Sequence, residues 1–287
     1  MKPTRHTTAV LILTAAAAAG CSKHDDALQA KAASADSAAA KPVTTTGESL
    51  EVNATDEEGV VPEPSSNVIG PVSFADGEAA YQARKYSDAT VIFDRYTAQR
   101  PANAWGHYML GLSAWKNGDL AKSEQAFERA LSIDPNHVKS LVNLSRVFID
   151  QKRYDDAIVR LTRAADIDPE SPQVHRLLGR TYHDQGKADA AVESYRRAIE
   201  VNELDAWSMN NLGLLFLETG RAEEALPLLT RAVELRQDVP AFHNNLGMAL
   251  EHTGRFKEAV TAYQGAVTAD PGYTKAKRNL ARVEAIQ

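Results

Sequence analysis

The stretch from residue 104 to residue 136 reads AWGHYMLGLSAWKNGDLAKSEQAFERALSIDPN, and it decides the fold. Apolar and small residues recur along its first half at the spacing of one helix face: Tyr108, Gly111, Leu112 and Trp115. The tripeptide at 117–119 then interrupts the pattern as a turn, and a second helical pattern follows. Pro135 ends that second helix, because proline lacks an amide donor and disfavours helix at the residue before it. The stretch is therefore one unit of helix, turn, helix and stop.

The same unit returns every 34 residues without insertion or deletion. A small position recurs as Gly77, Gly111, Ser145, Gly179, Gly213 and Gly247 (111 − 77 = 34). A large position recurs at the same step as Phe93, Phe127, Leu161, Tyr195, Leu229 and Tyr263. A fixed period of this length is typical of a solenoid of stacked helix pairs, because no single unit can bury its own apolar face.

The small residues have a steric role in this arrangement. We expect Gly111 and its equivalents to lie where the first helix of a unit meets the second, so that a Cβ would push the two axes apart. We expect Ser123 and Ala130, with their equivalents, to let the first helix of the next unit approach. Leu110 and Phe127 then fill the remaining space.

The pattern resembles the tetratricopeptide repeat (TPR) over about residues 70–287. The last full unit carries the matching positions Leu246, Gly247, Ala259, Tyr263, Ala266 and Pro271. The resemblance implies an all-α, right-handed superhelical solenoid of about six helix pairs with a capping helix at the C-terminal end. It divides the array into a degenerate first unit at 70–103, five units at 104–271 and the capping helix at 272–287. Glu203 and Gln237 replace the stop proline, so we expect those two junctions to run more smoothly into the next helix.

The N-terminus is a segment of a different kind. Lys2 and Arg5 precede a short apolar run and small residues, which is the pattern of a secretory signal at 1–20. Cys21 follows at the cut site, and this resembles the lipobox of bacterial lipoproteins, although Ala18 stands where that family prefers leucine. The resemblance implies that Cys21 is acylated and becomes the first residue of the mature chain. An ordinary signal peptide with an incidental cysteine is the alternative.

The compartment follows from this resemblance. Residues 21–69 contain the lipidated cysteine and a tether that is disordered by composition. Ser22, rather than aspartate, follows Cys21, which resembles export to the outer membrane of a Gram-negative cell with the array facing the periplasm. Loss of Lys2 and Arg5 with the signal leaves 30 basic against 38 acidic residues. Such an acidic protein is a poor candidate for binding nucleic acid.

No motif in the sequence indicates catalysis. The chain has no Gly-rich phosphate loop, HExxH, GxSxG or cysteine cluster. The nearest histidine pairs, His175 with His183 and His243 with His252, lack the spacing of metal ligands. We therefore predict a protein that is not an enzyme and that needs no cofactor or metal.

Binding is expected on the concave surface, which the resemblance assigns to the first helices. The aromatic group there is Trp105, Tyr108, Leu112 and Trp115, and aromatic residues are enriched at binding hot spots. The alternative is that they cover the atypical first unit or are themselves covered by the tether. The basic group is Lys139, Arg146, Arg176, Arg180 and His183. It predicts an anionic partner group, and pairing with Asp150 and Asp184 is its alternative.

The third group consists of asparagines. Its members are Asn143, Asn210, Asn211, Asn244, Asn245 and Asn279. Such a ladder can bind an extended peptide backbone through donor and acceptor together, and it is similar to the groove of the TPR arm of O-linked N-acetylglucosamine transferases. The alternative is that each asparagine bonds the backbone of its own repeat.

These observations predict a lipid-anchored adaptor that binds protein segments during cell-envelope assembly. Pilus or secretin assembly, outer-membrane biogenesis and recruitment of wall enzymes are all possible settings. The alternative is a carbohydrate-binding subunit of a polysaccharide export or modification system, in which Trp105 and Trp115 stack on sugar rings. The sequence leaves the partner and the oligomeric state open.

Overall fold

The computed structural model describes residues 70–285 of the 287-residue chain. All of them belong to one compact unit, residues 59–287. The predictions for the signal at 1–20, for Cys21 and for the tether up to residue 69 lie outside the described residues. Within residues 70–285, no helix combines the length and the apolar character needed to cross a membrane.

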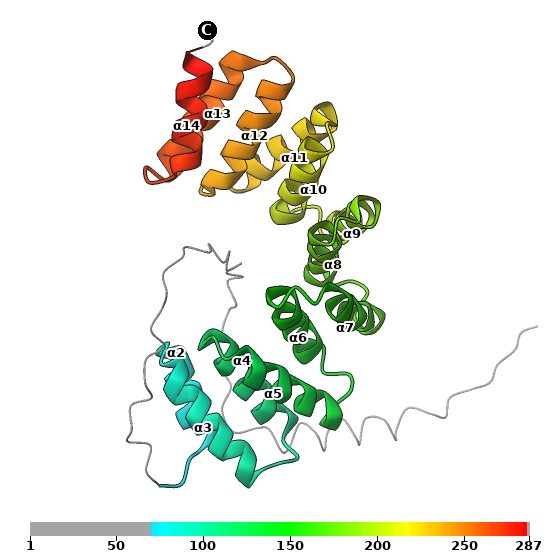
Figure 1. Cartoon of the computed structure of the whole chain (residues 1–287), viewed down its shortest axis with the longest axis vertical. Helices are drawn as coiled ribbons and strands as arrows, with labels where there is room; N and C mark the ends of the chain where they lie inside the picture. The colour runs from blue at the N-terminus through cyan, green and yellow to red at the C-terminus, as the bar shows by residue number, and fades with distance from the viewer. Residues whose placement is uncertain (1–69, 286–287) are drawn as a thin grey trace, which may run out of the picture. The chain divides into compact units, whose positions relative to one another are not determined.

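The described residues form thirteen helices and no strand, and the helices follow one another in pairs along an arc (Figure 1). The pairs are α2 (Phe74–Gln82) with α3 (Tyr86–Gln99), α4 (Ala104–Lys116) with α5 (Leu120–Ile133), α6 (Val138–Asp150) with α7 (Tyr154–Ile167), α8 (Pro172–Asp184) with α9 (Ala188–Val201), α10 (Ala206–Glu218) with α11 (Ala222–Leu235), and α12 (Pro240–His252) with α13 (Phe256–Ala269). A last helix, α14 (Thr274–Glu284), packs on α13 and covers the end of the array. The predicted all-α solenoid with its capping helix is confirmed.

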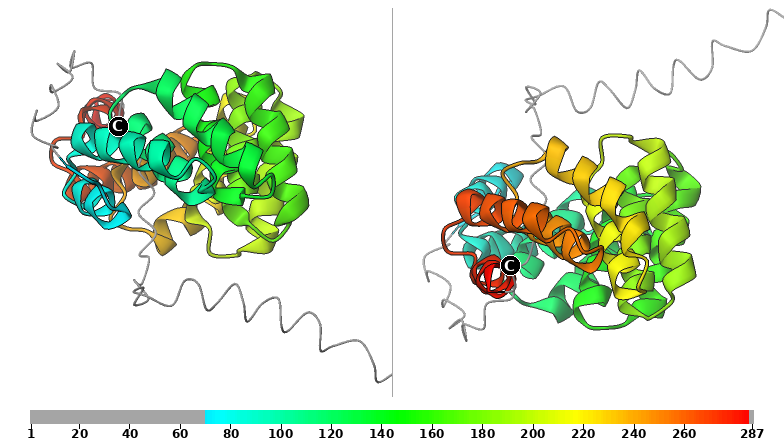
Figure 2. Two further views of the ribbon diagram at one scale, coloured as in Figure 1. Left: turned by 90° about the horizontal axis from the view of Figure 1, so that it is seen from below. Right: turned by 90° about the horizontal axis from the view of Figure 1, so that it is seen from above.

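Two kinds of contact hold the array together. Each helix packs on the one before it and on the one after it, so the core is continuous from unit to unit. In addition, several first helices contact the first helix of the next unit: α2 contacts α4, α4 contacts α6, α8 contacts α10, α10 contacts α12, and α12 contacts α14. No second helix of the described residues makes a comparable contact with the next second helix. The first helices are therefore crowded on the inside of the curve, and end-on views show the helices winding around it (Figure 2).

The expected steric role of the small position is confirmed. A Cβ built on Gly111 would lie 2.7 Å from the ring of Phe127, and one on Gly247 would lie 2.5 Å from the ring of Tyr263. Gly77, Gly179 and Gly213 meet the same obstacle. Each glycine thus lets the large side chain of its second helix lie directly on the first helix, and those large side chains are fully buried.

Two expectations about the units are wrong. Ser123 faces the first helix of its own unit, because its Oγ donates to the carbonyl oxygen of Gly111 at 2.8 Å. The junctions at Glu203 and Gln237 are not smoother, because the second helix stops at the same repeat position with or without proline. Extended backbone at Asn202 and at Arg236 supplies the break instead, and the Asn202 side chain accepts a bond from the second residue beyond it.

A left-handed residue closes the turn within each unit. Glycine occupies this position at Gly118, Gly186, Gly220 and Gly254, with φ between +74° and +82°. Arg84 and Lys152 occupy it in the other two units, with φ of +59° and +60°. Left-handed backbone is unfavourable for residues with a Cβ, so these two turns carry strain that the glycine turns do not.

Candidate partner-binding surface

The crowding of the first helices defines the candidate surface. We call the surface formed by α4, α6, α8, α10, α12 and α14 on the inside of the curve the concave face. Side chains bridge neighbouring first helices along it, from Trp105 beside His137 at one end to Asn279 bonded to Asn244 at the other. The three predicted groups of residues all lie on these helices.

The aromatic group gathers on α4. The Trp105 ring lies 4.9 Å from the Tyr108 ring, and the His137 ring at the start of α6 lies within 5.6 Å of both. Trp105 is 40% exposed, whereas Tyr108 is only 8% exposed. Burial raises the pKa of the Tyr108 hydroxyl, which accepts a bond from Asn143 at 3.4 Å. Trp105 is therefore the aromatic residue of this group that offers most surface to a partner.

Leu112 and Trp115 have a partly structural role. Both are half-buried and pack against the apolar cluster of the first three units, together with Phe74 and Tyr81 of the first unit. Their alternative role in covering the first unit is thus supported. The indole Nε1 of Trp115 also donates to a carboxylate oxygen of Asp150 at 2.7 Å. This bond ties α4 to α6 and fixes the orientation of the ring.

Three cations surround the two indole rings. The Lys139 ammonium lies 5.0 Å from the centre of Trp105, and the Lys116 ammonium lies 4.8 Å from that of Trp115. The guanidinium of Arg146 lies 6.0 Å from the Trp115 ring, on the edge of the range for a cation–π contact. The structure thus joins the aromatic group to the first half of the basic group.

The second half of the basic group has internal partners. Arg176 makes two bonds of 2.8 Å to the carboxylate of Asp205, which caps the start of α10 and is itself buried. Arg180 lies 3.7 Å from Asp184, which is one of the two pairings that the sequence offered as an alternative. His183 lies 2.6 Å from Glu218 on α10. Partner binding by these three stays a prediction, but each of them already holds a carboxylate.

Arg146 is in a different position. Its guanidinium donates to the side-chain oxygen of Asn143 at 3.2 Å, and it forms no ion pair within residues 70–285. Burial lowers the pKa of Arg146, and the charges of Arg176 and Arg180 add to this shift, whereas Tyr108 and Asp150 oppose it.

The asparagines form a chain of bonds between their own amides. Asn279 donates to Asn244, Asn244 to Asn245, Asn245 to Asn210, and Asn210 to Asn211, at 2.9–3.5 Å. The chain crosses α10, α12 and α14, so it links the last two units and the capping helix. Asn143 alone follows the alternative prediction, because its amide donates to the Lys139 carbonyl of its own helix at 2.9 Å. Asn210 and Asn244 are buried, whereas Asn211, Asn245 and Asn279 are partly exposed and keep capacity for a second bond, which a peptide backbone could use.

Sequence reasoning missed the bonds between units. Trp115 with Asp150 and His183 with Glu218 join the same two repeat positions, 35 residues apart in both cases. The 34-residue register could have revealed this pair, because it brings those positions side by side on consecutive first helices. It could also have revealed Trp207, which stands three repeats after Trp105 and packs on Phe242 with ring centres 4.9 Å apart.

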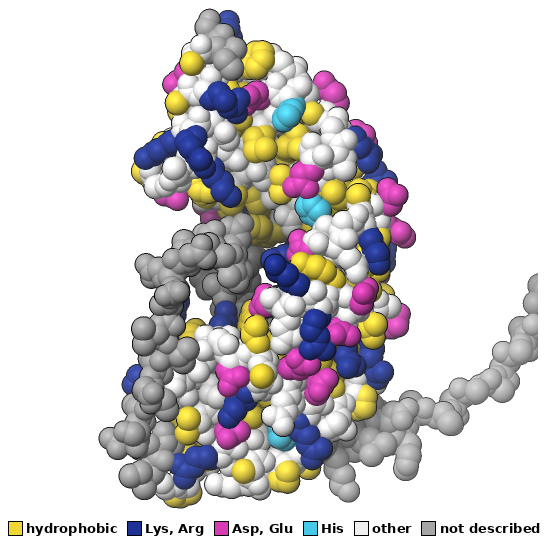
Figure 3. Space-filling model, viewed as in Figure 1, with side chains coloured by type: hydrophobic (Ala, Val, Ile, Leu, Met, Phe, Trp, Pro, Cys, Tyr) yellow, Lys and Arg dark blue, Asp and Glu magenta, His cyan; other side chains and the backbone are white. Residues whose placement is uncertain are grey.

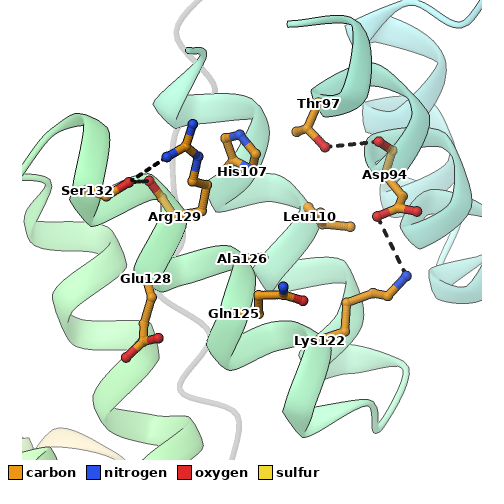
Figure 4. Close-up of a pocket in the computed structure, with 10 residues that line it drawn as sticks. All are labelled: Asp94, Thr97, His107, Leu110, Lys122, Gln125, Ala126, Glu128, Arg129 and Ser132. Atoms are coloured by element: carbon orange, nitrogen blue, oxygen red, sulfur yellow. Dashed lines mark hydrogen bonds and ion pairs between the residues drawn. The ribbon is translucent and has the colours of Figure 1, made fainter. Parts of the chain in front are cut away.

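A hollow lies elsewhere, lined by side chains of α3, α4 and α5 (Figure 4). It has a volume of about 440 Å³, and Lys122 pairs with Asp94 across it at 3.6 Å. A second hollow of about 410 Å³ lies at the equivalent place between α9 and α11. Such hollows follow from the gaps between second helices, so they do not single out a site. No group of three or more potential metal ligands occurs within residues 70–285.

The surface charge is mixed rather than segregated. On the face shown in Figure 3, basic and acidic side chains alternate over the whole array. Against this background, Arg146 is a cation without an ion pair among the described residues, and Asp150 is the carboxylate that acts on it electrostatically.

Comparison with known protein families identifies the same repeats that the structure shows. Residues 74–138, 114–181 and 210–274 match family descriptions that read "Tetratricopeptide repeat", and residues 179–220 match one that reads "TPR repeat". No curated protein sequence matches the chain. Among solved structures, Pseudomonas aeruginosa PilF aligns with a TM-score of 0.62 and 17% identity, over 72% of this chain and 95% of PilF.

Two further structures resemble the array. A MamA crystal structure aligns with a TM-score of 0.52 and 24% identity, over 60% of this chain and 94% of MamA. YrrB, described as a TPR protein with an unusual peptide-binding site, aligns with a TM-score of 0.51 and 17% identity, over 65% of this chain and 96% of YrrB. At these identities, the likeness concerns the fold.

Proposed function

The chain belongs to the tetratricopeptide repeat family, and from this premise we propose that it is a non-enzymatic adaptor whose concave face binds segments of protein partners. The observation that carries the proposal is the exposed Trp105, stacked on Tyr108 in the middle of cationic and amide groups. A large exposed aromatic residue beside fixed polar groups is the composition of a binding hot spot.

The rest of the concave face suits a polypeptide. The amide chain from Asn211 to Asn279 offers donors and acceptors at intervals set by the packing of the first helices. An extended backbone presents donors and acceptors in turn, so it can bond such a row without regard to its own side chains. The description of YrrB as peptide-binding shows that an array of this fold can serve that purpose.

The membrane anchor and the cell envelope are further parts of the proposal. Cys21, acylated after removal of residues 1–20, would hold the array at the periplasmic side of the outer membrane. More than one acyl chain gives stable anchoring, where a single chain gives marginal binding. An array held at the envelope in this way would recruit partners to assembly sites there.

The anchor is tested with Cys21→Ala. The variant should leave the membrane fraction for the soluble periplasm, or remain unprocessed, and Ser22→Ala should stay in the membrane. A Cys21→Ala protein that is cleaved and still fractionates with membranes would show that no lipid at this residue anchors the chain.

The binding surface is tested by capture of partners from solubilised envelopes. Trp105→Ala should lose the partners that the parent chain captures, because truncation of a hot-spot aromatic residue costs more than about 2 kcal/mol of binding energy. Val159→Ala is the matched control, since Val159 is an exposed apolar residue on the second helix α7. Equal losses for both variants would contradict a role of the concave face.

A carbohydrate is the second candidate ligand, and the exposed indole of Trp105 is the observation in its favour. Tyr108 and Lys139 already contact that ring, however, so a sugar would have to share it with them. Titration with cell-wall and capsular glycans, beside envelope protein fragments, discriminates the two classes of ligand.

A further inference from the structure

The carboxylates on the concave face between α4 and α10 are all engaged. Asp150 accepts the Trp115 indole, Asp184 pairs with Arg180, Asp205 with Arg176 and Glu218 with His183. None of these four acidic groups forms an ion pair with the cations at the two indole rings.

Three cations therefore have no carboxylate in an ion pair with them. Lys116, Lys139 and Arg146 lie beside the two indoles and form no ion pair within the part of the chain that the structure describes. Burial lowers the pKa of Lys116 and of Arg146, and the charge of Arg146 lowers that of Lys116 further. A bound anion would relieve this repulsion and supply acceptors for the free N–H groups.

These cations form two poles along one helix. Lys139 lies at Trp105 near the start of α4, whereas Lys116 and Arg146 lie at Trp115 near its end. Trp115 stands ten positions after Trp105, which corresponds to about 15 Å along an α-helix. Tyr108 and Leu112 occupy the helix face between the poles.

We propose that the surface between α4 and α6 binds an acidic protein segment through two carboxylates, one at Lys139 beside Trp105 and one at Arg146 and Lys116 beside Trp115. The inference rests on the proposed function only in taking a protein segment as the occupant. In an extended chain, which rises about 3.3 Å per residue, side chains alternate between two faces, so two carboxylates about 15 Å apart on one face belong to residues four positions apart. Apolar residues between them would lie on Leu112.

The test uses the full chain and three capped synthetic peptides of one length. The first carries two glutamates four positions apart, with alanine and leucine between them. The second carries glutamines in their place, and the third carries the two glutamates side by side at an unchanged composition. Affinities are measured by titration at low and at high salt.

The first peptide should bind about tenfold more tightly than each of the others at low salt, because each carboxylate then meets a cation. High salt should reduce the advantage, since exposed charges are screened over about 10 Å. Arg146→Gln should remove the preference for the glutamate peptide over the glutamine peptide, and Arg146→Lys should restore part of it. Arg231→Gln, which removes an exposed arginine from the second helix α11, should leave the preference unchanged.

Three results would overturn the inference: equal affinity for all three peptides, a preference that persists in Arg146→Gln, or no binding of any peptide by a folded chain. Thermal melting of each variant verifies the fold. The proposed function fails separately, because capture of envelope partners that depends on Trp105 would survive a negative result with the acidic peptides.

Discussion

At the scale of single residues, the array depends on close contact between a glycine and the large side chain opposite it. Gly213 illustrates this, because a Cβ there would lie 2.6 Å from the branched carbon of Leu229, which is fully buried. Close-packed interiors cannot absorb added atoms without moving their neighbours. The glycine is therefore a packing residue, with ordinary helical backbone.

Gly213→Leu should destabilise the array by about 1–3 kcal/mol through overpacking. Urea denaturation followed by circular dichroism measures the change. Ala121→Leu is the control, since Ala121 is exposed on α5 and should change the stability by less than about 0.5 kcal/mol. Equal midpoints for the two variants would contradict the steric role of the glycine.

A second residue-scale feature is the difference between Arg176 and Arg180. The carboxylate of Asp205 is only 4% exposed and depends on Arg176 across two units, whereas Arg180 pairs with Asp184 on the exposed side of its own helix. Arg176→Ala should cost about 2–4 kcal/mol, because it leaves a buried charge without a partner. Arg180→Ala should cost less than about 0.5 kcal/mol. Measuring the free energy of unfolding of both variants tests this prediction. Similar losses for the two variants would mean that the buried pair stabilises the array no more than the exposed pair does.

The sequence predicted the residues of these sites better than it predicted their partners. Arg176 and the asparagines were placed correctly on first helices, but Asp205 stands 29 residues beyond Arg176 and Asn210 stands 35 before Asn245. Such pairs depend on the rotation from one unit to the next, which a linear pattern of apolar residues does not contain. The 34-residue register restricts the choice of partners without fixing the bonds.

At the scale of helices and turns, the 34-residue period predicted where nearly all helices and turns lie. The turn at 117–119 and the stop at Pro135 fall where the pattern placed them. The expectation at Glu203 and Gln237 was wrong, because the end of a helix there depends on backbone geometry at Asn202 and Arg236 rather than on proline. Local capping is a matter of individual side chains, so a repeat pattern predicts it poorly.

The left-handed turn residues give a prediction at this scale. Lys152→Gly should raise the stability of the array by about 1 kcal/mol, because glycine adopts φ near +60° without steric cost. The reverse change at the equivalent position, Gly186→Lys, should lower it by a similar amount. Opposite shifts of the melting temperature are expected, and shifts of the same sign would contradict the assignment of strain to this turn.

We expect the stability that the N-terminal cap of α6 contributes to depend on pH. The Nδ1 atom of His137 accepts the amide N–H of Ser140 at 3.2 Å, which requires a neutral ring. Burial lowers the pKa of His137 below its ordinary value of 6.5; Asp134 opposes this shift and Lys139 adds to it. The unfolded chain therefore takes up the proton at a higher pH than the folded chain does. The stabilising contribution is complete above pH 6.5 and declines as the pH falls below it.

His137→Asn tests this, because asparagine caps a helix without titrating. The variant should lose less stability than the parent chain between pH 7 and pH 5, as measured by urea denaturation at each pH. His252→Asn, at an exposed position of α12, should follow the parent. An unchanged pH dependence in His137→Asn would show that the cap does not titrate in this range.

At the scale of the whole molecule, the array has two surfaces of different character. The concave face carries the amide chain, the exposed Trp105 and the uncompensated cations, whereas the outside of the curve carries hollows that recur with the repeat. The fold alone does not choose between these surfaces. The choice rests on a combination that the concave face presents within a short distance: aromatic surface, spare hydrogen-bonding capacity and cations without an ion pair.

Photo-crosslinking in the living cell tests that choice most directly. A photoreactive amino acid is placed at Leu112, Arg180 or Leu214 on the first helices, and at Val159, Thr162 or Thr230 on the second helices, in the otherwise unchanged chain. Irradiation should attach a partner protein at the first three positions and leave the second three free of adducts. Adducts confined to Val159, Thr162 and Thr230 would show that partners bind the outside of the curve, and that the concave face is not the binding surface.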